Sequence, residues 1–275
     1  MEKAGAGPSQ ELVDSYEMID GTQPILGYSD AEHLRPILNT ASSYDPKNPY
    51  ANRDPRFYAS VYYNGTIRYL DQPNGDVVET YVGGNCGISD KVTDIRYTRT
   101  GYYMRKFNNF KSGIGQDADG LMRIFRLAEL YLNFAEAAYQ AVGPDGQVVS
   151  KVGAEALSAR DAVNKIRVRA GIPALSSGMS KDSFEKRYRN ERRVELAFEE
   201  HRFFDVRRWK ILNETDDFVT GMKIVKEEDG TFTYNRIKLA SRGTNADKYL
   251  LYPIKQTEVA KMLKHTGANW QNPGW

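Results

Sequence analysis

The stretch RNERRVELAFEEHRFFDVRRWK, residues 189–210, combines charge and aromatic side chains in an unusual way. Twelve of its 22 residues are charged, seven basic and five acidic. We predict one helix from about residue 182 to 210, opened by a capping box of Asp182 and Glu185. On such a helix, opposite charges three residues apart are neighbours. The predicted pairs are Arg192 with Glu195, Glu199 with Arg202, and Asp205 with both Arg202 and Arg208.

The aromatic residues of this helix do not share one face. They are Phe198, Phe203, Phe204 and Trp209. A helix with apolar groups on several sides is expected to be surrounded by protein, which would bury Trp209. Its charges must then be paired, because an unpaired buried charge is very costly. We therefore expect a buried structural ion-pair network rather than a catalytic or nucleic-acid-reading helix, formed by Arg192, Glu195, Glu199, Arg202, Asp205 and Arg208.

The overall composition excludes several classes of function. The chain has 275 residues, a net charge of +2, and 40% hydrophobic residues, so it can bury a core but lacks the basic excess of a nucleic-acid binder. A single cysteine, Cys86, rules out an intramolecular disulfide, and the three histidines lack metal-ligand spacing. No nucleophile elbow, P-loop, dinucleotide fingerprint or zincin motif occurs. We predict a non-enzymatic protein without metal or cofactor. The N-terminus does not resemble a signal peptide.

Three parts follow one another in the sequence. Residues 1–120 are rich in turns and loops, residues 121–212 form a helical core, and residues 213–275 hold a hairpin and a C-terminal tail. The expected helices cover residues 30–38, 121–142 (capped by Asp119), 155–170, 182–210 and 257–263. The expected β-structure comprises a hairpin in 56–69 around Asn64-Gly65, strands at 77–82 and 249–254, and a hairpin around residues 228–230. The predicted class is mainly α (α+β), with an αα-hairpin of the kind used in helical repeats.

Tyrosine is concentrated in the loop-rich part. Ten of the 18 tyrosines lie between residues 44 and 103, interleaved with Asn, Asp, Arg and Gly. A tyrosine ring offers an apolar face and a polar tip, which suits the apolar faces and hydroxyl edges of sugar rings. These tyrosines either pack beneath the loops or form a ligand platform. The candidate ligand-binding residues are Tyr62, Tyr63, Tyr69, Tyr81 and Asn85.

Six ordered segments resemble one family. They are ANRDPRFYASVYYNG (51–65), TGYYMRKF (100–107), RLAELYLNFAEAA (126–138), VNKIRVRAGIP (163–173), the charged stretch 189–210, and LYPIKQTEV (251–259) with NWQNPGW (269–275). Together they resemble the C-terminal half of the SusD/RagB family, nutrient-binding lipoproteins on the outer surface of Bacteroidetes-type bacteria. The family's signal peptide and lipidated cysteine belong to the half that this chain does not match.

The resemblance implies a mainly helical fold with long loops and small β-hairpins. It also implies non-catalytic capture of oligosaccharides, less often peptides, with a SusC-like TonB-dependent transporter at the outer membrane. Residues 189–210 correspond to the family's structural signature. Ligand residues vary within the family, so none is carried over. The alternative is a peptide-binding or protein-interaction scaffold with no glycan site in this half. A glycoside hydrolase is a third interpretation.

Overall fold

The computed structural model describes residues 7–69, 75–88, 97–108, 123–149, 155–215, 217–243 and 247–275. Its helices are α1 (Gln10–Ser15), α2 (Pro55–Ser60), α3 (Leu127–Val142), α4 (Ala159–Ala170), α5 (Lys181–Glu195), α6 (His201–Arg208), α7 (Leu212–Thr215), η1 (Asp247–Leu250) and α8 (Gln256–Thr266). Its strands are β1 (Ile25–Tyr28), β2 (Pro36–Leu38), β3 (Val61–Tyr62), β4 (Tyr103–Met104), β5 (Gln147–Val148), β6 (Leu157–Ser158), β7 (Phe218–Lys226) and β8 (Phe232–Ser241). Within this part of the chain, all four sheets are two-stranded. The predicted α-rich α+β class is confirmed.

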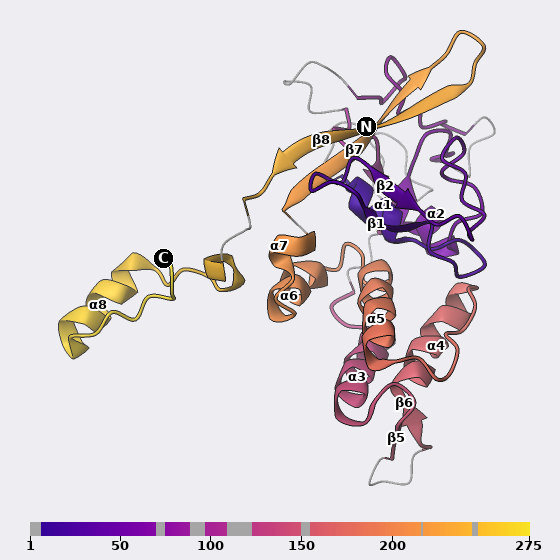
Figure 1. Cartoon of the computed structure of the whole chain (residues 1–275). Coiled ribbons are helices and arrows are strands. Elements are labelled where there is room, and N and C mark those ends of the chain that lie inside the picture. Colours follow the sequence, from indigo (N-terminus) through magenta and orange to yellow (C-terminus); the bar gives the residue numbers. More distant parts are fainter. Residues whose placement is uncertain are drawn as a thin grey trace.

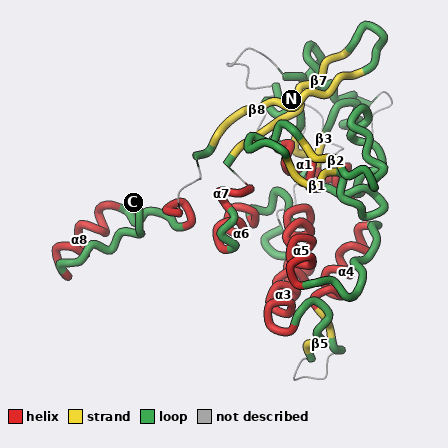
Figure 2. Tube along the Cα trace, viewed as in Figure 1, coloured by secondary structure: helices red, strands yellow, loops and turns green. Residues whose placement is uncertain are grey.

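Figure 1 shows how these elements are arranged. Helices α3, α4 and α5 stand together at one end of the molecule, and the loop-rich N-terminal part with the β7–β8 hairpin lies at the other. The segment that carries α8 extends away from both as a C-terminal arm. Figure 2 makes the contrast clear, since loops dominate the part around α1 and α2. The molecule therefore consists of a helical layer, a loop-rich layer and an arm.

The helical layer is held by close packing of α3, α4 and α5. Ala135 and Ala138 of α3 are buried in a cluster with Val163, Phe184 and Tyr188. Because alanine side chains are small, α3 and α4 approach closely, and the predicted αα-hairpin is confirmed. The predicted start of its first helix is wrong, because α3 begins only at residue 127. The predicted cap, Asp119, lies outside the described residues.

Helix α4 ends where the Gly171 stop in the sequence predicts. Gly171 adopts the left-handed conformation with φ +81°, and its N–H bonds back to the last turn. The next residue, Ile172, donates its N–H to the Arg167 carbonyl over 3.1 Å and is buried. The predicted glycine stop is therefore confirmed.

The predicted single helix over 182–210 is wrong. Ser180 caps α5 by accepting the Ser183 N–H, so the predicted Asp182–Glu185 box does not open it. The chain then leaves the helix after residue 195, and Phe198 and Glu200 adopt positive φ angles of 64° and 65°.

Helix α6 starts directly after this break, and the break has a physical cause. Lys106 donates to the carbonyl oxygens of Glu195 and Ala197, which a continuing helix would have used itself. Consequently Phe203 and Phe204 on α6 are 40% and 58% exposed, contrary to the predicted enclosure of this stretch. Trp209 is half-buried.

The predicted hairpin in residues 56–69 is also wrong. Asp54 accepts the Arg56 N–H over 2.8 Å and Pro55 occupies the first helical turn, so this segment starts as α2. Only β3 is extended, and it pairs with β4 rather than with residues after the turn. Gly65 does turn the chain, with φ +90°. A local helix start thus outweighs the alternating apolar pattern.

Three other predicted elements differ from the structure. The expected helix over 30–38 is replaced by the β1–β2 hairpin. Residues 77–82 contain a single bridge, from Val77 to Ile67, instead of a strand. Residues 249–254 hold the end of η1 and irregular chain, where the Gln271 side chain bonds the Ile254 N–H (2.7 Å) and carbonyl (2.9 Å) in place of a partner strand. The expected helix near 257–263 is confirmed as α8.

The long β7–β8 hairpin is confirmed, and it is joined to α1 near the start of the chain. In α1, the Glu11 carboxylate accepts the hydroxyl of Thr220 at 2.6 Å. Asp14 receives both terminal nitrogens of Arg236, at 2.6 and 2.7 Å. The hairpin is thereby fixed against α1, and its Ile224 is fully buried in the core of the loop-rich layer.

Candidate ligand-binding site

A cavity of about 410 Å³ lies between the loop-rich layer and the β7–β8 hairpin. Six of its 13 lining residues are aromatic, and four others carry amide or charged groups. The aromatic residues are Tyr50, Tyr58, Tyr63, Tyr81, Phe232 and Tyr234. The amide and charged residues are Asn48, Asn64, Glu79 and Lys226. An open, aromatic-lined cavity with a few polar groups is typical of a small-ligand site.

The first wall of the cavity is formed by Tyr50, Tyr58 and Tyr63. The ring centroids of Tyr50 and Tyr63 are 4.7 Å apart, and Tyr63 stacks on Phe57 at 5.1 Å. The Tyr58 hydroxyl donates to the Tyr50 carbonyl over 2.7 Å and accepts the Arg53 N–H over 3.0 Å. Burial, together with the neighbouring Tyr102 hydroxyl, raises the pKa of Tyr50 well above its usual range. This wall is neutral and firmly packed.

The second wall joins a loop to the hairpin. The ring centroids of Tyr81 and Phe232 of β8 are 5.6 Å apart. The residue after Tyr81, Val82, donates its N–H to the Ile224 carbonyl over 2.9 Å. Tyr234 meets Tyr50 edge to face at 5.6 Å, which connects this wall to the first. Residues from three separate parts of the sequence therefore form one cavity.

The loop over residues 77–88 carries Glu79 and Tyr81 and is organised by Asn85. The Asn85 side chain accepts the Glu79 N–H (3.1 Å) and donates to the Val77 carbonyl (2.8 Å). In return, the Glu79 carboxylate accepts the Asn85 N–H over 3.3 Å. The loop is so tight that a Cβ at Gly87 would lie 1.8 Å from the Tyr81 carbonyl oxygen. Asn85 thus holds the loop that forms part of the cavity wall, although Asn85 itself does not line the cavity.

Several polar groups of the cavity remain open to a ligand. No hydrogen bond among the described residues uses the hydroxyls of Tyr81 or Tyr234. The Asn64 side-chain oxygen accepts the Thr80 N–H over 3.0 Å, which leaves the Asn64 NH₂ group without a described partner. Hydroxyl, amide and carboxylate groups beside aromatic faces can hydrogen-bond a polyhydroxylated ligand.

The five candidate ligand residues have different positions. Tyr63 and Tyr81 line the cavity, and Asn85 supports it without lining it. Tyr62 is only 3% exposed and packs with Tyr103 in a small core cluster. Tyr69 is not among the lining residues.

Four further aromatic residues of the cavity were not singled out from the sequence. Tyr50 and Tyr58 belong to the same tyrosine-rich region, but nothing in the sequence distinguishes them from the others. Phe232 and Tyr234 follow the predicted turn at 228–230. Only the tertiary fold brings this turn to the tyrosine loops.

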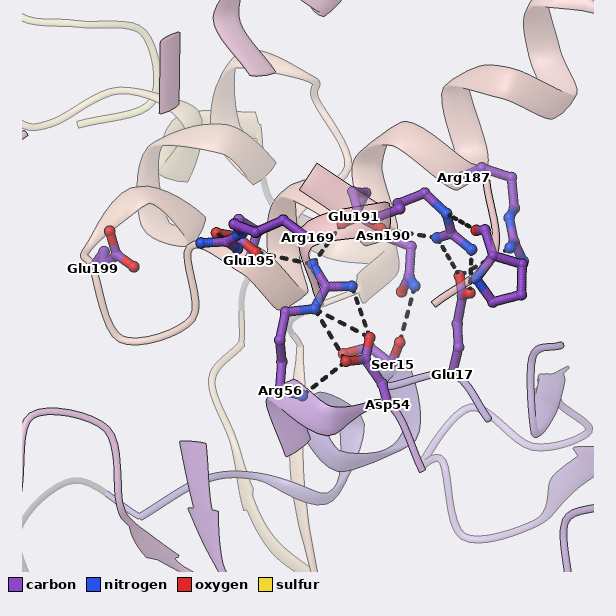
Figure 3. A network of polar contacts seen from close by, with 12 residues as sticks. Ser15, Glu17, Asp54, Arg56, Arg169, Arg187, Asn190, Glu191, Glu195 and Glu199 are labelled. Carbon is purple, nitrogen blue, oxygen red and sulfur yellow. Dashed lines mark hydrogen bonds and ion pairs between the residues drawn. The ribbon is translucent and has the colours of Figure 1, made fainter. Parts of the chain in front are cut away.

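The charged stretch forms a network that joins the helical layer to the loop-rich layer, and Figure 3 shows the part that contains Arg56, Arg169 and Glu195. The Glu195 carboxylate accepts from Arg56 (3.0 Å), Arg169 (2.6 Å) and Arg126. Glu199 pairs with Lys106 and Arg126. These partners come from α2, α4 and the segments before α3, so the network joins elements far apart in the sequence.

A second group of ion pairs extends the network to α6. The Arg192 guanidinium donates to the Asp205 carboxylate over 2.7 Å. Arg192 therefore pairs with a residue of α6, beyond the break after residue 195, and not with the expected Glu195. The expected pair of Asp205 with Arg208 is present at 2.7 Å. Arg208 also donates to the carboxylate of Glu136 on α3, which accepts the indole Nε1–H of Trp209 over 2.7 Å. Arg202 lies half-buried on α6.

A smaller cavity of about 150 Å³ lies beside this network. Its most buried cations, Arg56, Lys106 and Arg126, already bond carboxylate or carbonyl oxygens. We therefore assign it a structural role. In the described part of the chain no group of three or more His, Cys, Asp or Glu residues could hold a metal ion. Of the helices described, none has both the length and the apolar character needed to cross a bilayer.

Acid should weaken this network at a defined pH. The arginines around Glu195 outweigh its burial and lower its pKa from 4.5 to about 2. The unfolded chain therefore takes up the proton first as the pH falls, so the stabilisation is complete above about 4.5 and is lost towards 2. We expect the free energy of unfolding, measured by urea titration, to fall through this window. A Glu195→Gln variant should show a flatter profile, and an identical profile would contradict this assignment.

Comparisons with known proteins agree with this architecture. The sequence profile of the SusD family matches residues 2–275. The crystal structure of a SusD-like protein from Bacteroides fragilis is 32% identical with a TM-score of 0.73, covering 98% of this chain and 47% of its own. A SusD-like carbohydrate-binding protein from the same species is 25% identical with a TM-score of 0.58, covering 91% and 46%. No curated protein matches the chain.

The chain thus spans about half the length of these two solved structures. The family profile nevertheless covers nearly every residue, and the structural match extends over the helical layer, the loops and the hairpin alike. The chain belongs to the SusD family.

Proposed function

We propose that this protein binds oligosaccharides, without chemical turnover, in the cavity between its two aromatic walls. The observation that carries the proposal is the juxtaposition of six aromatic rings with unengaged hydroxyl and amide groups in one open cavity. Aromatic rings pack against the apolar face of a pyranose, and the polar groups bond its hydroxyls. Membership of the SusD family and the carbohydrate-binding description of one B. fragilis relative support it.

The cavity also has the dimensions for a short glycan segment. Its volume of about 410 Å³ lies within the range of roughly 300–1,000 Å³ found for small-ligand sites. Its walls are fixed by packing before any ligand arrives, since Tyr50 is 6% exposed and Tyr58 bonds the backbone on both sides. A preformed site loses little conformational entropy on binding.

Removing one ring from each wall tests the site. We expect Tyr63→Ala and Tyr81→Ala each to weaken glycan affinity about tenfold, the equivalent of ~1.4 kcal/mol. Isothermal titration calorimetry against a glycan panel would measure this. Tyr69→Ala is the matched control, because Tyr69 lies outside the cavity and its loss should leave affinity unchanged. Affinities indifferent to Tyr63 and Tyr81 would reject the assignment, and product release from a bound glycan would reject non-catalytic binding.

We further propose that the protein acts at the outer bacterial surface with a TonB-dependent transporter. Family membership supports this role. Affinity-tagged protein should recover such a transporter from detergent-solubilised outer membranes of a Bacteroidetes-type bacterium. Recovery of no transporter would reject the partnership without affecting the glycan proposal.

The second candidate function is peptide binding or protein interaction through the surface around α6. Phe203 stacks on Tyr252 of the arm at 5.6 Å, and Phe203, Phe204 and Tyr252 are 40%, 58% and 62% exposed. Exposed apolar patches are typical of interaction sites. A Phe204→Ala variant that loses a protein or peptide partner, in a chain that binds no glycan, would favour this function.

A further inference from the structure

The two charged groups of the cavity have different contacts, and neither forms an ion pair within the described residues. Glu79 and Lys226 both line it. The Glu79 carboxylate already accepts the backbone N–H of Asn85 over 3.3 Å. Lys226 forms no ion pair within the described residues, and its ammonium lies 5.4 Å from the centre of the Tyr81 ring. One cation at the cavity thus lacks a carboxylate partner.

The position of Lys226 follows from the hairpin. It ends β7 and pairs with Phe232 across the turn. Side chains alternate along a strand, so Lys226 lies on the same face as the buried Ile224, while Lys223 lies on the opposite face. Lys226 is therefore placed beside Tyr81 by strand register, with its ammonium over the Tyr81 ring.

The acidic residues near Lys226 are engaged elsewhere or face away. Glu227 accepts the Thr233 hydroxyl and Asp229 accepts the Thr231 hydroxyl, both within the turn. Strand alternation directs Glu227 away from the Lys226 face. Glu228 is exposed in the turn. The remaining acid is Glu79, which can accept ligand hydroxyls with the oxygen that Asn85 does not use.

We propose that the cavity selects oligosaccharides bearing an anionic substituent, a uronate carboxylate or a sulfate ester, which pairs with Lys226. This inference rests on the proposed glycan-binding function and names its ligand class. The anionic group meets the uncompensated ammonium, Tyr81 and Phe232 pack against the sugar ring, and Glu79 accepts a neighbouring hydroxyl. Hydrogen bonds between charged groups are stronger than neutral ones, so this contact would favour acidic over neutral glycans.

The test starts with a glycan array holding neutral, uronate-bearing and sulfated oligosaccharides, probed with the intact chain. Calorimetry then compares matched pairs of equal length. One pair is tetragalacturonate and its neutral methyl ester, and the other is a κ-carrageenan tetrasaccharide, whose only charges are sulfate esters, and its neutral desulfated form. The first pair isolates the carboxylate and the second isolates the sulfate.

We expect the acidic member of a pair to bind at least about tenfold more tightly than its partner, and Lys226→Ala to abolish that difference. Lys223→Ala removes the same charge from the opposite face and should change nothing. Affinity for the acidic ligand should also fall as sodium chloride rises, because Lys226 is exposed.

Two results would overturn the inference while leaving glycan binding intact. One is equal affinity for neutral and acidic glycans that still depends on Tyr63 and Tyr81. The other is acidic-glycan binding that Lys226→Ala does not weaken. Absence of binding to every array member would instead reject the proposed function and this inference together.

Discussion

Replacing Glu195 with alanine is expected to lower the free energy of unfolding by about 3 kcal/mol. The Glu195 side chain is 2% exposed and accepts from Arg56, Arg126 and Arg169. Its removal leaves Arg56 and Arg126, 13% and 16% exposed, with fewer acceptors in a poorly solvated space. Arg169 is 58% exposed and can return to water, which limits the loss.

Urea denaturation followed by circular dichroism would measure this change. Glu258→Ala is the matched control, because Glu258 pairs with Lys261 on the surface of α8, where both side chains are more than half exposed. Exposed pairs contribute little, so the control should unfold as the wild type does. An unchanged midpoint for Glu195→Ala would contradict a buried network. A folded Glu195→Ala protein that had lost glycan binding alone would contradict its structural role.

Replacing Gly87 with alanine is expected to weaken glycan affinity by about a hundredfold, the equivalent of ~2.7 kcal/mol. A Cβ there would lie 1.8 Å from the Tyr81 carbonyl oxygen and 2.8 Å from its carbon. Both atoms are backbone, so the clash cannot be relieved by a side-chain rotation. The loop must move, and it carries the Tyr81 ring and Glu79 out of the second wall.

The helical layer should be unaffected by Gly87→Ala, because the hydrogen bonds that anchor the loop go to residues 64–66, to Tyr103 and to Ile224 of the hairpin. Calorimetry should show lost affinity, while the helical circular dichroism signal and the main unfolding transition stay close to those of the wild type. Gly178→Ala is the control, since its Cβ would meet nothing within 4 Å; its φ of +76° adds a backbone strain that Gly87, whose φ is not positive, does not have. Full affinity in Gly87→Ala would show that the loop does not form the wall.

Local chemistry made three features of the fold predictable. The Gly171 stop, the αα-hairpin and the turn at 228–230 depend on residues close in sequence, and all three are confirmed. The break after Glu195 was not predictable, because the amine that takes the helix carbonyls comes from Lys106, 89 residues away. Periodicity within one segment carries no information about such a distant donor.

The candidate site was predictable only as a region. Tyrosine density pointed to the loops, and Tyr63 and Tyr81 do line the cavity. Tyr62 differs from Tyr63 by one position, yet strand alternation turns it into the core. The second wall required Phe232, which lies beside Tyr81, and Tyr234, which contacts Tyr50. The salt bridge of Arg236 to Asp14 fixes the strand that carries both against α1.

The attachment of the hairpin to α1 has a consequence for the order of folding. Thr220 and Glu11 are separated by 209 residues, and Arg236 and Asp14 by 222. Contacts of such separation close late, because nearly the whole chain must be present before they can form. The helical layer can assemble from neighbouring segments while the hairpin is still free. The cavity is then among the last features to form, so under the proposed function glycan binding would report completed folding of the chain.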